Sequence, residues 1–125
     1  MRRNVVRSHE DLEVWKLAMR LTVDVYRTTA QLPSEERFGL QTQTRRAAVS
    51  VAANIAEGAA RNSAADFARF LAIALGSLAE LDTELRLCED LQFVVYRDDL
   101  RQSVRTIRIM LSRLRDAVRK RAESR

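Results

Sequence analysis

Aromatic residues, glycine, proline and cysteine are all scarce in this chain of 125 residues. Aromatics make up 6% of it and there are three glycines and one proline, whereas 46% of the residues are hydrophobic. A composition rich in alanine, leucine and arginine but poor in glycine and proline favours helices over sheets. The length is sufficient for a domain with its own core. We therefore expect an all-α fold in which residues 1–125 form a single domain.

Several functional classes require residues that this sequence lacks. The single cysteine, Cys88, allows no intramolecular disulfide and is typical of a reducing compartment. The single histidine, His9, excludes the di-metal site of helical bundles, which takes a Glu-x-x-His pair from each of two helices. The glycines are isolated and form no phosphate loop. We therefore expect no catalytic residues, no metal, no cofactor and no small-molecule substrate, and hence no enzyme.

Long hydrophobic runs are also missing. No run approaches the roughly 18–20 residues that a membrane-spanning helix needs. The first residues carry charges but no apolar stretch of the kind found in a secretory signal. These absences predict a cytoplasmic protein with no membrane contact.

Apolar residues recur at intervals of three and four in four stretches, which is the spacing of a buried helix face. The clearest is an unbroken seam from Phe67 to Cys88. Ser63 is expected to cap that helix, Gly58 to end the preceding one in a left-handed conformation, and Pro33 to stop the first. The predicted helices cover about 9–32, 40–57, 63–91 and 98–120. Their seams and short connections predict an antiparallel, up-down-up-down four-helix bundle.

Two details predict contacts beyond a simple core. Gly76 lies in the middle of the third predicted helix, where glycine costs about 1 kcal/mol relative to alanine, and this indicates a close helix crossing. The first predicted helix has two apolar stripes, one through Val14 and Leu21 and one through Trp15 and Tyr26. One stripe serves the core, and the other is expected to be covered by a second neighbour or by another subunit. This surplus of apolar surface predicts a homo-oligomer.

Polar side chains follow one face of the second predicted helix, among the small residues of Arg45–Gly58. One interpretation is a solvated face. The other is a partly buried hydrogen-bond network in which Arg46 pairs with glutamates of the third predicted helix, because a buried charge requires such partners. The residues of this predicted structural network are Gln43, Arg46, Ser50, Asn54, Glu57, Glu80 and Glu84.

Positive charge is concentrated at the C-terminal end of the chain. From Arg97 onward, ten basic residues stand against four acidic ones, a net charge of +6, whereas residues 1–96 carry 12 basic and 13 acidic residues. An arginine stripe runs beside the apolar seam here, over about 33 Å at 1.5 Å per residue. The stripe consists of Arg97, Arg101, Arg105, Arg108, Arg115 and Arg119.

The arginine stripe has two interpretations. Guanidinium groups suit phosphate contacts, so the stripe predicts a sequence-tolerant, salt-dependent surface for RNA, DNA or another polyanion. The alternative is a solvated face that is paired with acidic residues of the third predicted helix, such as Asp82, Glu89 and Asp90. No motif for reading base sequence is present.

A series of short motifs in the first three predicted helices is shared with one protein family. In chain order they are His9-Glu10-Asp11-Leu12, Val14-Trp15, Leu32-Pro33, Glu36, Gly39-Leu40, Gln43, Arg45-Arg46-Ala47-Ala48, Ser50-Val51, Asn54-Ile55-Ala56-Glu57-Gly58, Phe67, Phe70-Leu71 and Gly76-Ser77-Leu78-Ala79-Glu80-Leu81. Over about 9–92 the chain resembles the four-helix-bundle proteins encoded by intervening sequences in bacterial 23S ribosomal RNA genes, the S23 family. The fourth predicted helix carries little of the motif.

The resemblance implies a four-helix bundle that assembles into a ring-like homopentamer, and it implies no established activity. A related group of bundle proteins assists reverse transcriptases and binds nucleic acid, which for this chain is an analogy only. Together with the arginine stripe, the resemblance predicts a non-enzymatic homo-oligomer that binds RNA or other nucleic acid through its fourth helix. The alternative is a structural or protein-interaction module with no nucleic-acid role.

Overall fold

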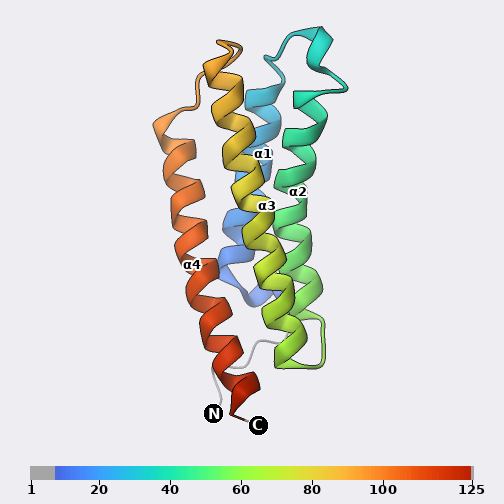
Figure 1. Ribbon diagram of the computed structural model, residues 1–125, viewed down its shortest axis with the longest axis vertical. Helices are drawn as coiled ribbons and strands as arrows, with labels where there is room; N and C mark the ends of the chain where they lie inside the picture. Colours follow the sequence, from blue (N-terminus) through green and yellow to red (C-terminus); the bar gives the residue numbers. More distant parts are fainter. Residues whose placement is uncertain (1–7, 125) are drawn as a thin grey trace.

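The computed structural model describes residues 8–124 and contains four long helices. They are α1 (Glu13–Thr29), α2 (Leu40–Ala59), α3 (Ala64–Asp90) and α4 (Asp98–Glu123), and the short 3₁₀ helices η1 (His9–Asp11) and η2 (Ser34–Glu36) precede α1 and α2. Successive long helices run in opposite directions, side by side (Figure 1). Residues 8–124 contain no strand. The predicted all-α, up-down-up-down bundle is therefore confirmed.

The first helix begins later than predicted because Ser8 caps η1 rather than α1. The Ser8 hydroxyl accepts a hydrogen bond from the Glu10 amide at 3.2 Å. Leu12 is then extended, with φ −90° and ψ 120°, and this interrupts the helical backbone before Glu13. At the other end α1 stops at Thr29, ahead of Pro33, as the restriction on residues before proline requires.

The prediction that Gly58 ends α2 in a left-handed conformation is wrong. Gly58 lies inside α2, and no glycine has a positive φ angle. Its role is steric, because a Cβ at this position would lie 2.8 Å from the Phe70 Cβ and 3.0 Å from the Phe67 Cδ1. Glycine is therefore needed for the close approach of α2 to α3.

The left-handed residue of the bundle is Gln92, with φ 64°, just after α3. The Gln92 amide donates to the Glu89 carbonyl at 2.8 Å, and the Phe93 amide donates to the Cys88 carbonyl at 2.9 Å. This pair of bonds is a Schellman motif, which satisfies carbonyl groups that the last helical turn leaves free. Phe93 then packs against the apolar cluster that contains the buried Cys88.

Gly76 does not mark a close crossing within the protomer, contrary to the prediction. No atom lies within 4 Å of the place its Cβ would occupy, and the residue is exposed. The neighbouring Ser77 is buried and points toward α2, where it meets Ser50. The close crossing of this bundle is therefore at Gly58, and Gly76 leaves bare backbone on the outer face of α3.

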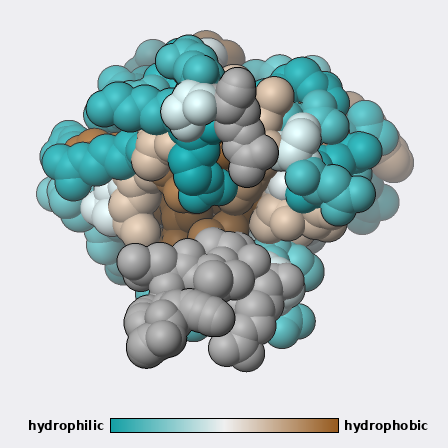
Figure 2. Space-filling model, turned by 90° about the horizontal axis from the view of Figure 1, so that it is seen from below, coloured by the Kyte–Doolittle hydropathy of each residue, from teal (hydrophilic) through white to brown (hydrophobic). Residues whose placement is uncertain are grey.

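The core is built from the predicted apolar seams. Every member of the seam from Phe67 to Cys88 is buried, and Leu21, Val51 and Ile107 face it from the other helices with at most 2% of their surface exposed. Viewed along the bundle, apolar residues lie at the centre and polar residues at the rim (Figure 2). None of the helices in the described part of the chain has both the length and the apolar character that crossing a bilayer requires.

The second apolar stripe of α1 is only partly covered. Leu12 and Thr29 are buried, whereas Met19 and Tyr26 remain exposed. The Thr22 hydroxyl lies 3.2 Å from the Ala48 carbonyl of α2, so α2 covers part of this stripe. The rest of the stripe is free on the surface of the protomer.

Candidate nucleic-acid interface

Arg101 of the predicted arginine stripe is a structural residue. Its guanidinium pairs with Glu89 of α3, donates to the Tyr96 carbonyl at 3.0 Å and stacks on the Tyr96 ring at 4.2 Å. The Tyr96 hydroxyl in turn donates to Asp82 at 2.8 Å, and the Tyr96 amide donates to Glu89 at 3.0 Å. Burial, together with the hydrogen bond to Asp82, raises the pKa of Tyr96 well above its usual range. Arg101 therefore fixes the start of α4 and is not free to bind a ligand.

Two further arginines of the stripe form ion pairs with aspartates of α4. Arg97 pairs with Asp99 at 3.0 Å, and Arg115 pairs with Asp116 at 3.2 Å. The alternative interpretation pairs the stripe with acidic residues of α3. Within residues 8–124, Arg101 and Glu89 form the only such ion pair. The stripe is therefore not neutralised by α3 as a whole.

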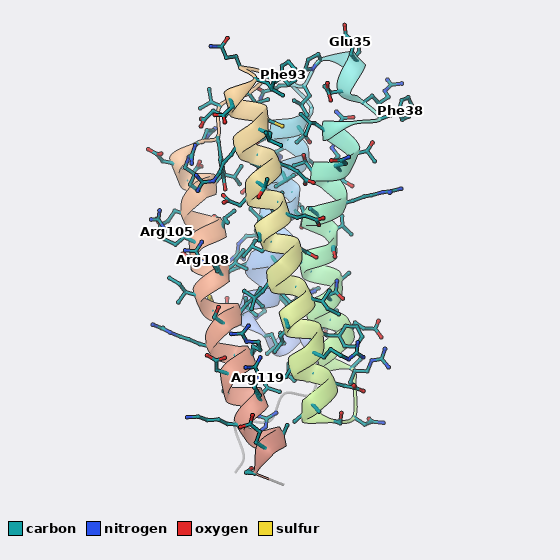
Figure 3. The ribbon with its side chains drawn as sticks, viewed as in Figure 1. Glu35, Phe38, Phe93, Arg105, Arg108 and Arg119 are labelled. Carbon is teal, nitrogen blue, oxygen red and sulfur yellow. The ribbon has the colours of Figure 1, made fainter. Side chains whose placement is uncertain are left out.

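Three arginines of the stripe have no carboxylate partner among residues 8–124. Arg105, Arg108 and Arg119 are exposed along α4 (Figure 3). Three further cations share this state but lie outside the predicted stripe, because the stripe is a single line of residues along the helix. The complete set, which we name the free cationic surface, is Arg105, Arg108, Arg113, Arg119, Lys120 and Arg121.

The free cationic surface has no aromatic side chain, because residues 97–125 contain no phenylalanine, tyrosine, tryptophan or histidine. A base has no aromatic ring to stack on there. The chemistry available is ionic contact between guanidinium or ammonium groups and an anion such as phosphate. The arrangement is suited to contact with a polyanion backbone.

The predicted polar network of α2 forms only in its middle. The hydroxyl groups of Ser50 and Ser77 lie 2.7 Å apart, and the Asn54 amide nitrogen lies 2.9 Å from the Ser50 hydroxyl. Glu57 is exposed and pairs with Arg61 at 2.6 Å, one turn further along.

The remaining predicted members of this network do not join it. Gln43 and Arg46 are exposed, and within residues 8–124 Arg46 forms no ion pair with Glu80 or Glu84. The Ser50–Ser77 contact is a small, partly buried network, and Gln43, Arg46 and Glu57 on the same face are exposed to solvent.

Glu84 is a half-buried carboxylate that lacks a partner. Its Oε1 atom is buried and, within the described residues, accepts no hydrogen bond. Burial raises the pKa of Glu84 above its ordinary value, and the negative charge of Glu80 raises it further. The charged form of Glu84 therefore destabilises the folded protomer.

Replacing Glu84 by glutamine is expected to stabilise the protein at pH 7 and to leave it unchanged at pH 4. The pKa is higher in the folded chain than the unfolded value of about 4.5, so the folded chain binds this proton more tightly. The penalty is absent below the unfolded pKa and develops as the pH rises through the folded pKa. Urea midpoints of the wild type and Glu84→Gln at the two pH values measure the effect.

The matched control for this experiment is Glu35→Gln, which changes an exposed carboxylate and should leave both midpoints unaltered. A stabilisation by Glu84→Gln that is larger at pH 4 than at pH 7 would contradict the assignment.

Other reactive groups form no further site in the described residues. Cys88 is fully buried, as predicted, and burial raises the pKa of its thiol, so the thiol stays protonated. Within residues 8–124 no three His, Cys, Asp or Glu side chains are grouped so that they could hold a metal ion.

The fold and its surface define a four-helix-bundle protein whose distinguishing chemistry is a cationic fourth helix. Residues 10–113 match the family of 23S rRNA-intervening sequence proteins, and the chain belongs to this family. The predicted family resemblance is confirmed, and the match extends it into α4. It stops before Arg119, Lys120 and Arg121, which lie outside the matched residues.

A solved structure has a similar fold. It is the crystal structure of a protein with unknown function from the S23 ribosomal protein family of Bacteroides thetaiotaomicron, with a TM-score of 0.60 and 24% identity, covering 84% of this chain and 94% of that chain. At this identity the similarity is one of fold. No curated protein matches the sequence.

Proposed function

We propose that this protein is a non-enzymatic, cytoplasmic homo-oligomer that binds RNA or other nucleic acid through the free cationic surface of α4. The observation that supports the proposal is that six exposed cations have no carboxylate partner within residues 8–124. The residues from Arg97 onward carry a net charge of +6, so the potential over this helix is positive. Because the expected contacts are ionic contacts to phosphate, binding is expected to tolerate different sequences and to weaken steeply with salt.

Replacing Arg105, Arg108 and Arg119 by glutamine is expected to reduce the slope of log affinity against log salt concentration by about 2–3. Each substitution removes one cation and with it one contact to phosphate. At physiological salt the affinity for a fluorescent RNA hairpin should fall by about tenfold or more. Fluorescence anisotropy titrations between 50 and 200 mM KCl measure both quantities.

A triple variant with the same loss of charge is the control. Arg61, Arg69 and Arg86 are exposed on α3 and on the turn before it, outside the free cationic surface, and their replacement by glutamine should leave most of the affinity intact. Equal losses for the two triple variants would show that net charge alone matters. If neither variant changed the affinity, the proposal would be wrong.

The alternative is a structural or protein-interaction module with no nucleic-acid role. The observation in its favour is a set of large apolar side chains that are exposed on the α1–α2 side of the bundle: Met19, Val23, Tyr26, Phe38 and Val49. This alternative predicts a protein partner that is still recovered after nuclease treatment, and no salt-sensitive binding to RNA. It shares the expectation of self-association.

Self-association is part of the proposal, with a pentamer as the form that the family resemblance implies. Multi-angle light scattering should give about five times the chain mass of 14.3 kDa. A monomer at micromolar concentration would reject it.

A further inference from the structure

A groove of about 540 Å³ lies over the outer face of α2. Tyr26, Phe38 and Val49 supply its apolar lining, and Phe38, which is 87% exposed, projects from the turn before α2 (Figure 3). Gln41, Thr42 and Ser50 supply uncharged polar groups. A contiguous apolar surface of this kind, bordered by polar groups, is typical of a site where another molecule docks.

The groove is positively charged. Arg37, Arg45 and Arg46 line it, and its lining includes no acidic residue. Arg45 donates to the Thr29 hydroxyl at 2.9 Å and stacks on the Tyr26 ring at 4.4 Å. Within residues 8–124 none of these arginines has a carboxylate partner. An occupant that complements the groove carries both anionic groups and apolar groups, and in a protein these are carboxylates and apolar side chains.

The same chain carries such a surface on the outer side of α3. Ile73 and Leu87 are exposed there, and between them Gly76 leaves open space over the backbone. Glu80 is exposed between them and has no ion pair within the described residues. We name this surface, which consists of Ile73, Gly76, Glu80 and Leu87, the α3 face.

We propose that a second copy of this chain docks its α3 face into the groove over α2. The exposed Arg37 and Arg46 of the groove then lie beside Glu80, and Phe38 and Val49 pack against Ile73 and Leu87. The open backbone at Gly76 lets the partner approach closely. The proposal rests on the self-association proposed above and names the two surfaces that produce it.

The two surfaces differ, so the contact is head-to-tail, and each copy offers one groove and one α3 face. Contacts of this type form a ring if the rotation between copies closes and a filament if it does not. The two surfaces lie on α2 and α3, which are neighbouring helices (Figure 1). Repeating the contact therefore adds copies in one direction, and the angle between the two surfaces decides whether the ring closes.

Two substitutions separate the surfaces. Val49→Lys adds a cation to the floor of the positive groove. Gly76→Arg fills the open space on the α3 face, and its guanidinium pairs with Glu80 one turn away, which removes the charge that the groove needs. Each is expected to raise the dissociation constant of self-association by about 30-fold or more, the size expected for a central interface residue.

The decisive measurement is light scattering on each variant alone and on an equimolar mixture. Each variant alone should be a monomer, because one of its two surfaces is blocked. The mixture should form a 1:1 dimer, because the intact α3 face of Val49→Lys fits the intact groove of Gly76→Arg. Circular dichroism confirms that the variants are folded, and Phe38→Lys, at a side chain that hardly contacts the protomer, is a second groove variant.

The other outcomes reject the head-to-tail contact in different ways. If only the groove variants dissociate, the groove pairs with itself, and if only Gly76→Arg dissociates, α3 faces pair with each other. If neither dissociates, the interface lies elsewhere, and the proposed oligomer survives without this inference. A monomeric wild type rejects both the head-to-tail contact and the proposed self-association. Gln102→Lys adds a charge at an exposed position of α4 and should remain assembled.

Discussion

Replacing Gly58 by valine is expected to lower the free energy of unfolding by about 3 kcal/mol, because added atoms between α2 and α3 have no room. A Cβ at Gly58 would lie 2.8 Å from the Phe70 Cβ, which is fixed to the α3 backbone and cannot swing away. For Gly58→Ala the gain in helix propensity offsets part of the clash, and the expected loss is about 1–2 kcal/mol. Urea unfolding at a constant protein concentration measures both variants.

Gly76 is the matched control, since it is also a helical glycine but has no atom within 4 Å of a Cβ. Measured in the Val49→Lys background, in which the proposed contact is blocked, Gly76→Ala is expected to raise the free energy of unfolding by about 0.5–1 kcal/mol through helix propensity alone. The two glycine-to-alanine substitutions should therefore have opposite signs. A stabilising Gly58→Ala would show that the helices separate without loss and that the close crossing has little energetic importance.

Replacing Tyr96 by alanine is expected to lower the free energy of unfolding by about 3–5 kcal/mol. Tyr96 is 2% exposed and holds the connection between α3 and α4 through its ring, its hydroxyl and its backbone. The alanine variant leaves a cavity and removes the surface on which Arg101 stacks. Tyr96→Phe removes only the hydrogen bond to the partly exposed Asp82 and should lose about 1 kcal/mol.

Val95→Ala is the control for the Tyr96 variants, because Val95 lies in the same connection but is 68% exposed. It should stay within about 0.5 kcal/mol of the wild type. Thermal and urea unfolding of the three variants measure their losses in the free energy of unfolding and rank them. A loss for Tyr96→Ala no greater than that for Tyr96→Phe would mean that the ring contributes nothing and that the connection is held by other contacts.

The helices were predictable because their signal is local. The seam from Phe67 to Cys88 repeats at helical spacing, and the side chains that repeat are the ones that are buried. Gly58 and Gly76 could not be told apart in this way, because both are helical glycines and what distinguishes them is a neighbour in another part of the chain. Phe70 stands against Gly58, and nothing stands against Gly76.

The candidate site shows the same limit. Arg101 and Arg105 belong to one stripe in the sequence, yet Glu89 and Tyr96 engage Arg101, while Arg105 meets only Gln102 of its own helix. The stripe was a correct guide to the helix that carries the charge. Which arginines are free depends on the position of α3 and of the connection before α4, and the spacing within α4 contains no information about either.

The distribution of charge along α4 has a consequence for how the molecule turns in solution. Asp98 and Asp99 lie in its first turn, and Lys120 and Arg121 lie in its last. The helix macrodipole opposes this order with only about half a charge at each end, so the side chains dominate. The side chains of α4 therefore form an electric dipole, and a polyanion would turn its cationic end toward itself. In the proposed ring, the components of these dipoles along the ring axis add, whereas those perpendicular to the axis cancel.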